Sequence, residues 1–297
     1  MTDGLRELAP AKVNLCLLLG PARADGRHEL VTVFQPVGLC DRVVLEPAPL
    51  GAAADEVVCP GVPSTDNLAA AALRELRARS GWTGPPVRLT IEKRIPVAAG
   101  MAGGSADAGA ALRLGARAAG VGDDGLLREI AAGLGADVPA QVRPRRYLAT
   151  GAGEVLRPLA DPAPYGVLVL PSHASLSTAD VYREADRLGL ARDAAGLAER
   201  LGAVEAALDG GGELPDELVV NDLEPAARSL CPPIGAALDD ARRAGAHIAL
   251  VCGSGPTVIG LFRDAAAARG AAVQLAGRDP APIAVGLWPA EEGEVAA

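Results

Sequence analysis

The stretch IPVAAGMAGGSADAG, residues 95–109, decides how the rest of the chain is interpreted. It follows VRLTIEKRI, residues 87–95, in which apolar and polar residues alternate as in a β-strand. It leads into an alanine-rich segment that runs to about residue 120, with apolar residues at helical spacing. A strand, a glycine-rich loop and a helix therefore follow one another, and Ser105 is the predicted N-cap of the helix.

This junction suits an anion. The start of a helix presents unpaired backbone N–H groups and the positive end of the helix dipole, and glycines let an anion approach the backbone closely. A phosphate group is the predicted occupant, and an ordinary tight connection is the alternative. The sequence contains neither the G-x-x-x-x-G-K-[ST] segment of Walker-type proteins nor the H-R-D and D-F-G signatures of protein kinases. Both of these classes are therefore disfavoured.

Length and composition narrow the class of protein further. A chain of 297 residues exceeds what one hydrophobic core usually serves, so two domains are expected. A net charge of −9 and an aromatic content of 2% disfavour a nucleic-acid partner. No apolar run is long enough for a membrane span, and the first residues do not resemble a signal peptide. We therefore expect a cytoplasmic protein without a membrane partner.

Rare residue types add three expectations. The five cysteines are scattered without a C-x-x-C pair, which predicts reduced, mostly buried thiols. The three histidines are not at metal-ligand spacing, so a histidine-based metal centre is disfavoured. The 28 basic residues are 26 arginines and two lysines, Lys12 and Lys93. Codon bias explains the arginines, and the two lysines become candidates for positions that need a compact ammonium group.

Periodicity outside the opening stretch predicts a mixture of strands and helices. Strands are expected over 12–19, 30–39, 42–47, 167–171, on both sides of the glycine turn within 247–262, and over 282–288. Helices are expected over 65–81, 123–135, 178–189, 194–209, 216–229, 233–245 and from 264. LRPLADPAPYG, residues 156–166, contains three prolines and is the predicted domain boundary.

Three separated segments resemble, in order, the three motifs of the GHMP kinases: APAKVNL (9–15), the opening stretch (95–109) and VCGSGPT (251–257). Further segments are similar to one branch of this family: RADGRHEL (23–30), TVFQ (32–35), GADVP (135–139) and TGAGE (150–154). That branch phosphorylates the 2-hydroxyl of 4-diphosphocytidyl-2-C-methyl-D-erythritol in non-mevalonate isoprenoid biosynthesis. The resemblance extends over nearly the whole chain.

The resemblance implies an α+β GHMP kinase fold of two domains. Residues 1–156 would form a domain like ribosomal protein S5 domain 2, and residues 157–297 a ferredoxin-like domain, with the active site in the cleft. It implies transfer of the γ-phosphoryl group of ATP, with Mg²⁺, to a cytidine diphosphate-linked polyol. The partners are then small molecules, while the magnesium ligands and the oligomeric state stay undefined.

The resemblance also implies the catalytic residues. Lys12 and Asp137 match the catalytic lysine and aspartate of the family. Asp137 would orient the acceptor hydroxyl and accept its proton late, while Lys12 would keep Asp137 ionised and offset charge on the transferring group. From the residues alone, Asp137 fits an N-cap or turn before Pro139, and Lys12 fits a solvated cation at a strand edge. The loop that wraps the phosphates would consist of Pro96, Val97, Ala98, Ala99, Gly100, Met101, Ala102, Gly103, Gly104, Ser105 and Ala106.

The candidate substrate-binding residues are Asn14, Arg27, His28, Gly253, Ser254 and Gly255. His28 lies in the loop that meets the cytidine in the family, and Asn14 could reach the substrate from the first strand. Arg27 stands where this branch usually has an aromatic residue that stacks on cytosine; an arginine can stack or pair with a phosphate instead. The alternatives are a solvated loop residue for His28, an edge residue for Asn14, and a tight hairpin for 253–255.

Two other functions stay open: a GHMP kinase of another small alcohol, of the homoserine or mevalonate type, and a nucleotide-binding regulator without catalysis. Arg27 and the polar, basic AQVRPRRY, residues 140–147, depart from the branch pattern and bear on the substrate more than on phosphoryl transfer. Asp107 is expected to be a surface charge favoured by the helix dipole, and Lys93 a surface residue at its strand end.

Overall fold

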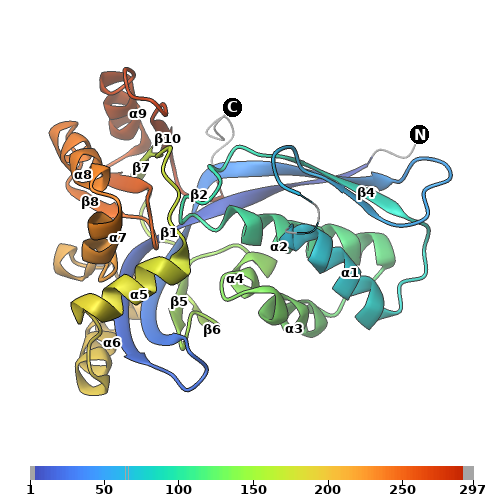
Figure 1. Ribbon diagram of the computed structural model, residues 1–297, viewed down its shortest axis with the longest axis horizontal. Helices are drawn as coiled ribbons and strands as arrows, with labels where there is room; N and C mark the ends of the chain where they lie inside the picture. Colours follow the sequence, from blue (N-terminus) through green and yellow to red (C-terminus); the bar gives the residue numbers. More distant parts are fainter. Residues whose placement is uncertain (1–3, 64, 66, 290–297) are drawn as a thin grey trace. The chain divides into compact units, whose positions relative to one another are not determined.

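The computed structural model describes residues 4–63, 65 and 67–289, which divide into two compact units (Figure 1). The first unit has the bounds Met1–Ala11, Leu39–Val97 and Ala102–Pro144, and the second has the bounds Lys12–Gly38, Ala98–Met101 and Arg145–Ala297. The chain therefore changes unit within two long strands, β1 (Leu5–Ala22) and β2 (His28–Pro47), and around the glycine-rich loop.

The first unit pairs strands with a group of helices. Its elements are β3 (Glu56–Val58), α1 (Leu68–Ser80), β4 (Val87–Glu92), α2 (Gly103–Ala119), α3 (Asp124–Leu134) and α4 (Val138–Val142). Strand β4 pairs antiparallel with residues 42–47 of β2 and parallel with β3. Helix α2 packs against α1 and α4, as Figure 1 shows.

Small residues allow α2 to approach its neighbours closely. A Cβ atom at Gly109 would lie 2.3 Å from the carbonyl oxygen of Gln141 in α4, and one at Gly115 would lie 2.7 Å from Leu76 in α1. The face predicted to be buried is buried, including Ala108. Larger side chains at these positions would keep the helices apart, which explains why α2 is rich in alanine and glycine.

The second unit contains a four-stranded antiparallel sheet in the order β10-β7-β9-β8. Its strands are β7 (Gly166–Leu170), β8 (Ile248–Val251), β9 (Val258–Phe262) and β10 (Ile283–Val285). Numbered along the chain, this order is 4-1-3-2, with helices between the first and second strands and between the third and fourth. That arrangement is the ferredoxin-like topology predicted for the C-terminal part.

Helices and a hydrophobic core complete the second unit. The remaining elements are β5 (Tyr147–Thr150), β6 (Val155–Pro158), α5 (Thr178–Leu188), α6 (Ala194–Leu208), two short 3₁₀ turns (Asp209–Gly211 and Asp216–Leu218), α7 (Glu224–Leu230), α8 (Pro233–Arg243) and α9 (Ala265–Gln274). Strand β5 pairs antiparallel with residues 32–34 of β2 and with β6. Leu17 and Leu19 of β1 join the core beneath the four-stranded sheet.

Three predicted elements differ from the structure. The strands expected over 30–39 and 42–47 are one continuous strand, β2. The helix expected over 216–229 is reduced to a 3₁₀ turn and the short α7. Between them the side chain of Asn221 accepts a hydrogen bond from the N–H of Leu223, 2.9 Å away. A local side-chain bond of this kind competes with helical backbone bonds, which explains the interruption.

The expectation for the cysteines is met. The five cysteines are buried, and none of them forms a disulfide bond. Burial raises the pKa of Cys16 and that of Cys40 to about 12, so both are inert thiols at neutral pH. Within the described part of the chain, no helix combines the length and the apolar character that a membrane span requires.

Candidate active site

Parts of the three sequence motifs come together in the second unit. The backbone N–H of Lys12, in β1, donates to the carbonyl of Met101 in the glycine-rich loop, 3.1 Å away. The thiol of Cys252, in the turn after β8, lies 3.6 Å from the carbonyl oxygen of Gly100 and 4.0 Å from that of Lys12. Segments that are far apart in the sequence thus meet at one place.

Glycines make this meeting possible. Gly100 has φ +73°, and a Cβ atom there would lie 2.1 Å from the carbonyl oxygen of Cys252. Gly253 has φ +56°, and its Cβ would lie 2.9 Å from the carbonyl oxygen of Gly100. Side chains at either position would clash with backbone and strain a left-handed conformation. The turn at 253–255 is therefore a tight connection, as the alternative held, and it also contacts the glycine-rich loop.

Polar side chains from other elements bind the turn at 253–255. The side-chain amide of Asn221 donates to the carbonyl oxygens of Val251 (2.8 Å) and Gly253 (2.7 Å). The hydroxyl of Ser254 lies 3.0 Å from that of Thr178, the first residue of α5. Asn221 was not predicted from the sequence, because nothing near it in the chain indicates that it serves a turn some thirty residues later.

Lys12 sits in a buried polar chain. Its side chain is only 5% exposed, and Nζ donates to Oδ1 of Asn14 at 2.7 Å. The amide of Asn14 donates in turn to the hydroxyl of Thr32 (2.7 Å), which donates to the carbonyl of Cys16 (2.6 Å). Nζ also lies 4.9 Å from the centre of the Phe34 ring. The solvated-cation alternative for Lys12 is therefore wrong, since the side chains of Lys12 and Asn14 are both buried and oriented.

The glycine-rich loop has an unusual backbone. Ala98 and Ala102 adopt positive φ values, +55° and +57°, as does Gly100. A positive φ at alanine is uncommon and costs energy, and such strain gathers at functional loops. Ala98 is exposed, so the loop is open to a ligand there.

The N-cap of helix α2 lies three residues earlier than predicted. Ala102 occupies the N-cap position, and Ser105 lies inside the first turn, so the expectation that Ser105 caps the helix is wrong. The left-handed backbone of Ala102 ends the loop, and helical dihedrals follow at once. Alanine has no side-chain acceptor for the first N–H groups of the helix, so these donors stay available to an anion.

Asp137 belongs to the first unit. It occupies the N-cap position of α4 and is half-buried, and Pro139 follows in the first turn. Among the described residues, its side chain forms no capping hydrogen bond with that helix. The position matches the N-cap alternative, but the carboxylate does not perform the capping. Its assignment as the catalytic aspartate stays a prediction.

His28, at the start of β2, is buried against α5. Its exposed fraction is 6%, and Nε2 lies 2.7 Å from a carboxylate oxygen of Asp186. The ring centre of Tyr182 lies 5.4 Å from that of His28. The solvated-loop alternative for His28 is therefore wrong. In the neutral imidazole, an Nε2–H bond to Asp186 leaves Nδ1 as a hydrogen-bond acceptor.

Tyr182 and Asp186 were missed by sequence reasoning. They are four residues apart, so they share one face of α5, and only the fold brings them to a histidine more than 150 residues upstream. The rarity of aromatic residues in this chain was the one available signal, since Tyr182 is one of three tyrosines.

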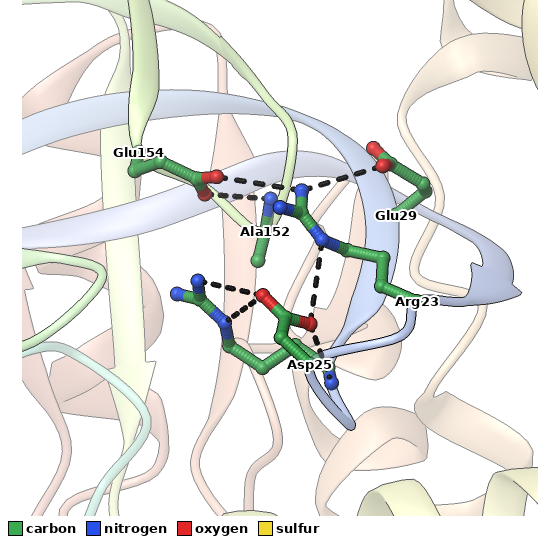
Figure 2. A network of polar contacts seen from close by, with 6 residues as sticks. Arg23, Asp25, Glu29, Ala152 and Glu154 are labelled. Carbon is green, nitrogen blue, oxygen red and sulfur yellow. Dashed lines mark hydrogen bonds and ion pairs between the residues drawn. The ribbon is translucent and has the colours of Figure 1, made fainter.

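The hairpin tip between β1 and β2 is held by a network around Arg23 (Figure 2). The Arg23 guanidinium pairs with Asp25 (3.4 Å), Glu29 (3.3 Å) and Glu154 (3.4 Å). Glu154 also accepts the backbone N–H of Ala152 at 2.6 Å. Arg23 lies in the RADGRHEL segment and Glu154 in the TGAGE segment. The network therefore joins two of the segments that resemble one branch of the family.

Arg27 lies at the same tip. Its guanidinium donates to Oδ2 of Asp25 through Nε (3.1 Å) and Nη2 (2.9 Å), and its side chain is 52% exposed. The backbone N–H and guanidinium of Arg27 lower the pKa of Asp25. Arg27 is thus paired locally and exposed, and its role in substrate binding stays a prediction.

Lys93 and Asp107 are not surface residues, contrary to expectation. Asp107 is 3% exposed, and Nζ of Lys93 donates to it at 2.7 Å and to Asp41 at 2.5 Å. Burial, reinforced by Asp41 and opposed by Lys93, raises the pKa of Asp107 to about 7. The expectation was wrong because the partner Asp41 is 52 residues upstream, in a strand that sequence patterns do not pair with this region.

The side chains that could bind a metal ion can also be compared with the ligands that magnesium requires. Among the described residues, no group of three or more histidine, cysteine, aspartate or glutamate side chains could hold a metal ion. Magnesium in nucleotide sites is bound through one or two carboxylates, water and the phosphates themselves.

Comparisons with known proteins agree with this geometry. Models of the GHMP kinases N terminal domain and of the GHMP kinases C terminal match residues 67–144 and 194–279. The chain belongs to the GHMP kinase family. The two-domain fold predicted from its motifs is confirmed. The two matches lie on either side of the predicted boundary at 156, which stays a prediction.

Several relatives share one name. A 4-diphosphocytidyl-2-C-methyl-D-erythritol kinase of Kineococcus radiotolerans is 42% identical over 288 residues, which cover 90% of this chain and 84% of that protein. One of Streptomyces coelicolor is 44% identical over 267 residues, which cover 87% and 88%. A crystal structure of 4-(cytidine 5'-diphospho)-2C-methyl-D-erythritol kinase is 34% identical, with a TM-score of 0.77 and coverage of 95% and 99%.

Proposed function

We propose that this GHMP kinase transfers the γ-phosphoryl group of ATP to the 2-hydroxyl of 4-diphosphocytidyl-2-C-methyl-D-erythritol, a step of non-mevalonate isoprenoid biosynthesis. The observation that carries the proposal is the convergence of the three motifs around the buried Lys12–Asn14 pair. The relatives named for this reaction add the acceptor. Both substrates are small metabolites, so we also propose that the enzyme acts in the cytoplasm.

The loop of residues 96–106 would bind the phosphates of ATP. Positive φ values before α2 turn the backbone, and the first N–H groups of the helix, at the positive end of its dipole, would bind the phosphate. A magnesium ion, when bound, would offset phosphate charge, and it would be held through the phosphates that this loop binds. The loop itself orients the group to be transferred.

Lys12 and Asp137 would carry the chemistry of the protein. Phosphoryl transfer passes through a loose transition state, so positioning and electrostatic stabilisation matter more than strong base catalysis. Asp137 would orient the 2-hydroxyl and accept its proton late in the reaction. The ammonium group of Lys12, oriented by Asn14, would stabilise the negative charge that the transferring group carries.

His28 and Tyr182 would recognise the cytidine. Nδ1 of His28 is an acceptor when Nε2 donates to Asp186, and the amino group of cytosine is a donor. The Tyr182 ring beside His28 offers an aromatic face for a base. These contacts give the proposed acceptor a recognition element that homoserine and mevalonate would not use.

The test is ADP release by the purified protein with magnesium and ATP and each of three acceptors: 4-diphosphocytidyl-2-C-methyl-D-erythritol, homoserine and mevalonate. We expect turnover with the cytidyl acceptor alone. Asp137→Asn should reduce kcat by about 10²–10⁴-fold while the protein stays folded. Near-normal turnover of Asp137→Asn would refute the catalytic assignment, activity with another acceptor would refute the substrate, and ATP binding without ADP release would favour a regulator.

A further inference from the structure

A buried cluster of three charges lies beside the glycine-rich loop and has no part in the proposed chemistry. Nζ of Lys93 donates to Oδ2 of Asp41 (2.5 Å) and to Oδ2 of Asp107 (2.7 Å). The exposed fractions of the three side chains are 15%, 0% and 4%. All three belong to the first unit. Burying charges to this extent costs desolvation energy, which the hydrogen bonds of the cluster must offset.

The cluster binds the entry of the loop. Oδ1 of Asp41 accepts the backbone N–H groups of Arg94 (2.6 Å) and Ile95 (2.9 Å). These are the last residues before Pro96, where the candidate phosphate loop begins. The same carboxylate that binds Lys93 therefore fixes the backbone that leads into the loop.

The cluster also binds the exit of the loop. Asp107 lies in α2, four residues after the helix begins at Gly103. A Cβ atom at Gly103 would lie 3.3 Å from Nζ of Lys93, so the ammonium group packs directly against the start of the helix. Lys93 thus connects the backbone before the loop with the helix after it.

The choice of lysine follows from this space. Arginine occupies 26 of the 28 basic positions in the chain, but not this one. A guanidinium group is larger and planar, whereas an ammonium group is compact and has three donors that can bind two carboxylates. Close contact with Gly103 leaves room for the smaller group.

The strained backbone of the loop indicates what the Lys93 cluster does. Ala98 and Ala102 hold positive φ values, and strained residues persist only where the surrounding structure fixes them. Bonds on both flanks of the loop supply such fixation. We propose that Lys93, held between Asp41 and Asp107, is a positioning residue that sets the backbone of the 96–102 loop for ATP phosphates. This inference rests on the proposed function of that loop.

The chain offers a matched control in β1 that binds the same helix, α2. Glu7 is bound between Arg113 (2.6 Å) and Arg117 (3.1 Å), and its side chain is 18% exposed. This second cluster also has three charges, with the signs reversed, but Arg113 and Arg117 lie one and a half to three turns beyond Asp107 along α2. Glu7→Gln therefore removes a comparable central charge without touching the flanks of the loop.

The experiment compares Lys93→Met, Asp107→Asn and Glu7→Gln with the wild type in two measurements. The first is amide hydrogen exchange of peptides covering 96–106 without nucleotide, and the second is titration with a non-hydrolysable ATP analogue. Lys93→Met should speed exchange in the loop and weaken analogue binding by at least about tenfold. Asp107→Asn keeps the side-chain shape, so it should also speed exchange in the loop and weaken analogue binding, but less than Lys93→Met does. Glu7→Gln should lower the melting temperature and leave both unchanged.

Steady-state kinetics separate positioning from general destabilisation. In Lys93→Met, KM for ATP should rise while KM for the acceptor and kcat at saturating ATP stay within about threefold of wild type. The inference is overturned if Lys93→Met changes neither the hydrogen exchange of the loop nor analogue binding. If Lys93→Met does not fold, the same outcome in Asp107→Asn overturns it. It is also overturned if Glu7→Gln changes both quantities as much as the loop variants do. Both binding and exchange can be measured without an acceptor. If the wild type failed to phosphorylate the cytidyl acceptor, the proposed function would fall, and these two measurements would still decide the role of Lys93.

Discussion

Two basic residues of the candidate site, Lys12 and Arg27, are held in opposite ways. Lys12 is 5% exposed, and its partner Asn14 is itself fixed by Thr32. The side chain of Arg27 is 52% exposed and pairs with Asp25, two residues away in the same turn. A buried, layered set of hydrogen bonds keeps a group in one position, whereas an exposed local pair is easily exchanged for another partner. The comparison predicts that catalysis depends on Lys12 and that recognition at Arg27 tolerates change.

Among the variants that test this comparison, the largest effect is expected for Lys12→Met. The substitution keeps the length of the side chain but removes the charge that would stabilise the transition state, so kcat should fall by about 10²–10³-fold. ADP release under saturating substrates measures it. A decrease of less than about threefold, in a variant that unfolds like the wild type, would show that the buried cation does not serve catalysis.

The support of Lys12 should matter next. Asn14→Leu removes the acceptor of the Lys12 bond and the donor of the Thr32 bond, so the free energy of unfolding should fall by about 1–3 kcal/mol. Loss of orientation should also reduce kcat by about tenfold. Urea denaturation and steady-state rates measure the two effects. Unchanged values for both would mean that the hydrogen-bond chain does not position Lys12.

A pH experiment extends the comparison to the other buried lysine. Burial raises the pKa of Asp107 from 3.8 to about 7. Lys93 opposes this rise and Asp41 adds to it, and the neutral thiol of Cys59 is also nearby. Between these two pH values the folded chain binds more protons than the unfolded chain, so the contribution of Asp107 to stability falls as pH rises through the window. Asp107→Asn should remove this component. Urea denaturation at pH 5 and pH 8 should show a smaller difference for the variant, and equal differences would contradict the burial argument.

The smallest effects are expected at the hairpin tip. Arg27→Ala removes an exposed pair, so the urea midpoint should not change measurably, and KM for the cytidyl acceptor should rise by no more than about threefold. Arg23→Ala is the sharper partner variant, because Arg23 bonds Glu29 and Glu154 across the tip. It should raise KM more than Arg27→Ala does. The reverse order would indicate that Arg27 itself contacts the substrate strongly.

Local patterns predicted the parts of the fold that depend on local physics. The strand, loop and helix around 95–109 follow from alternation, glycines and helical spacing, and the helix expected over 123–135 is α3. Ser105 was assigned wrongly because the left-handed backbone of Ala102 starts the helix earlier, and an alanine gives no signal of that conformation. Local chemistry was thus sufficient where the determining atoms are neighbours in the chain.

Contacts between distant segments were outside the reach of those patterns. Tyr182 and Asp186 are candidate site residues because they contact His28, and Lys93 is buried where it binds Asp41. Each partner is separated by a stretch of chain whose path only the fold defines. The resemblance to a family supplied roles for Lys12 and Asp137, whereas the hydrogen bonds that hold Lys12 came from the structure.

The most direct test of the central claim is identification of the product. The protein is incubated with magnesium, ATP and 4-diphosphocytidyl-2-C-methyl-D-erythritol, and the phosphorylated product is assigned by two-dimensional ³¹P–¹³C correlation. The account predicts one new phosphate monoester, coupled to carbon 2 of the methylerythritol unit, with one ADP formed for each. A phosphate at another carbon, or ADP formed without a phosphorylated acceptor, would contradict it.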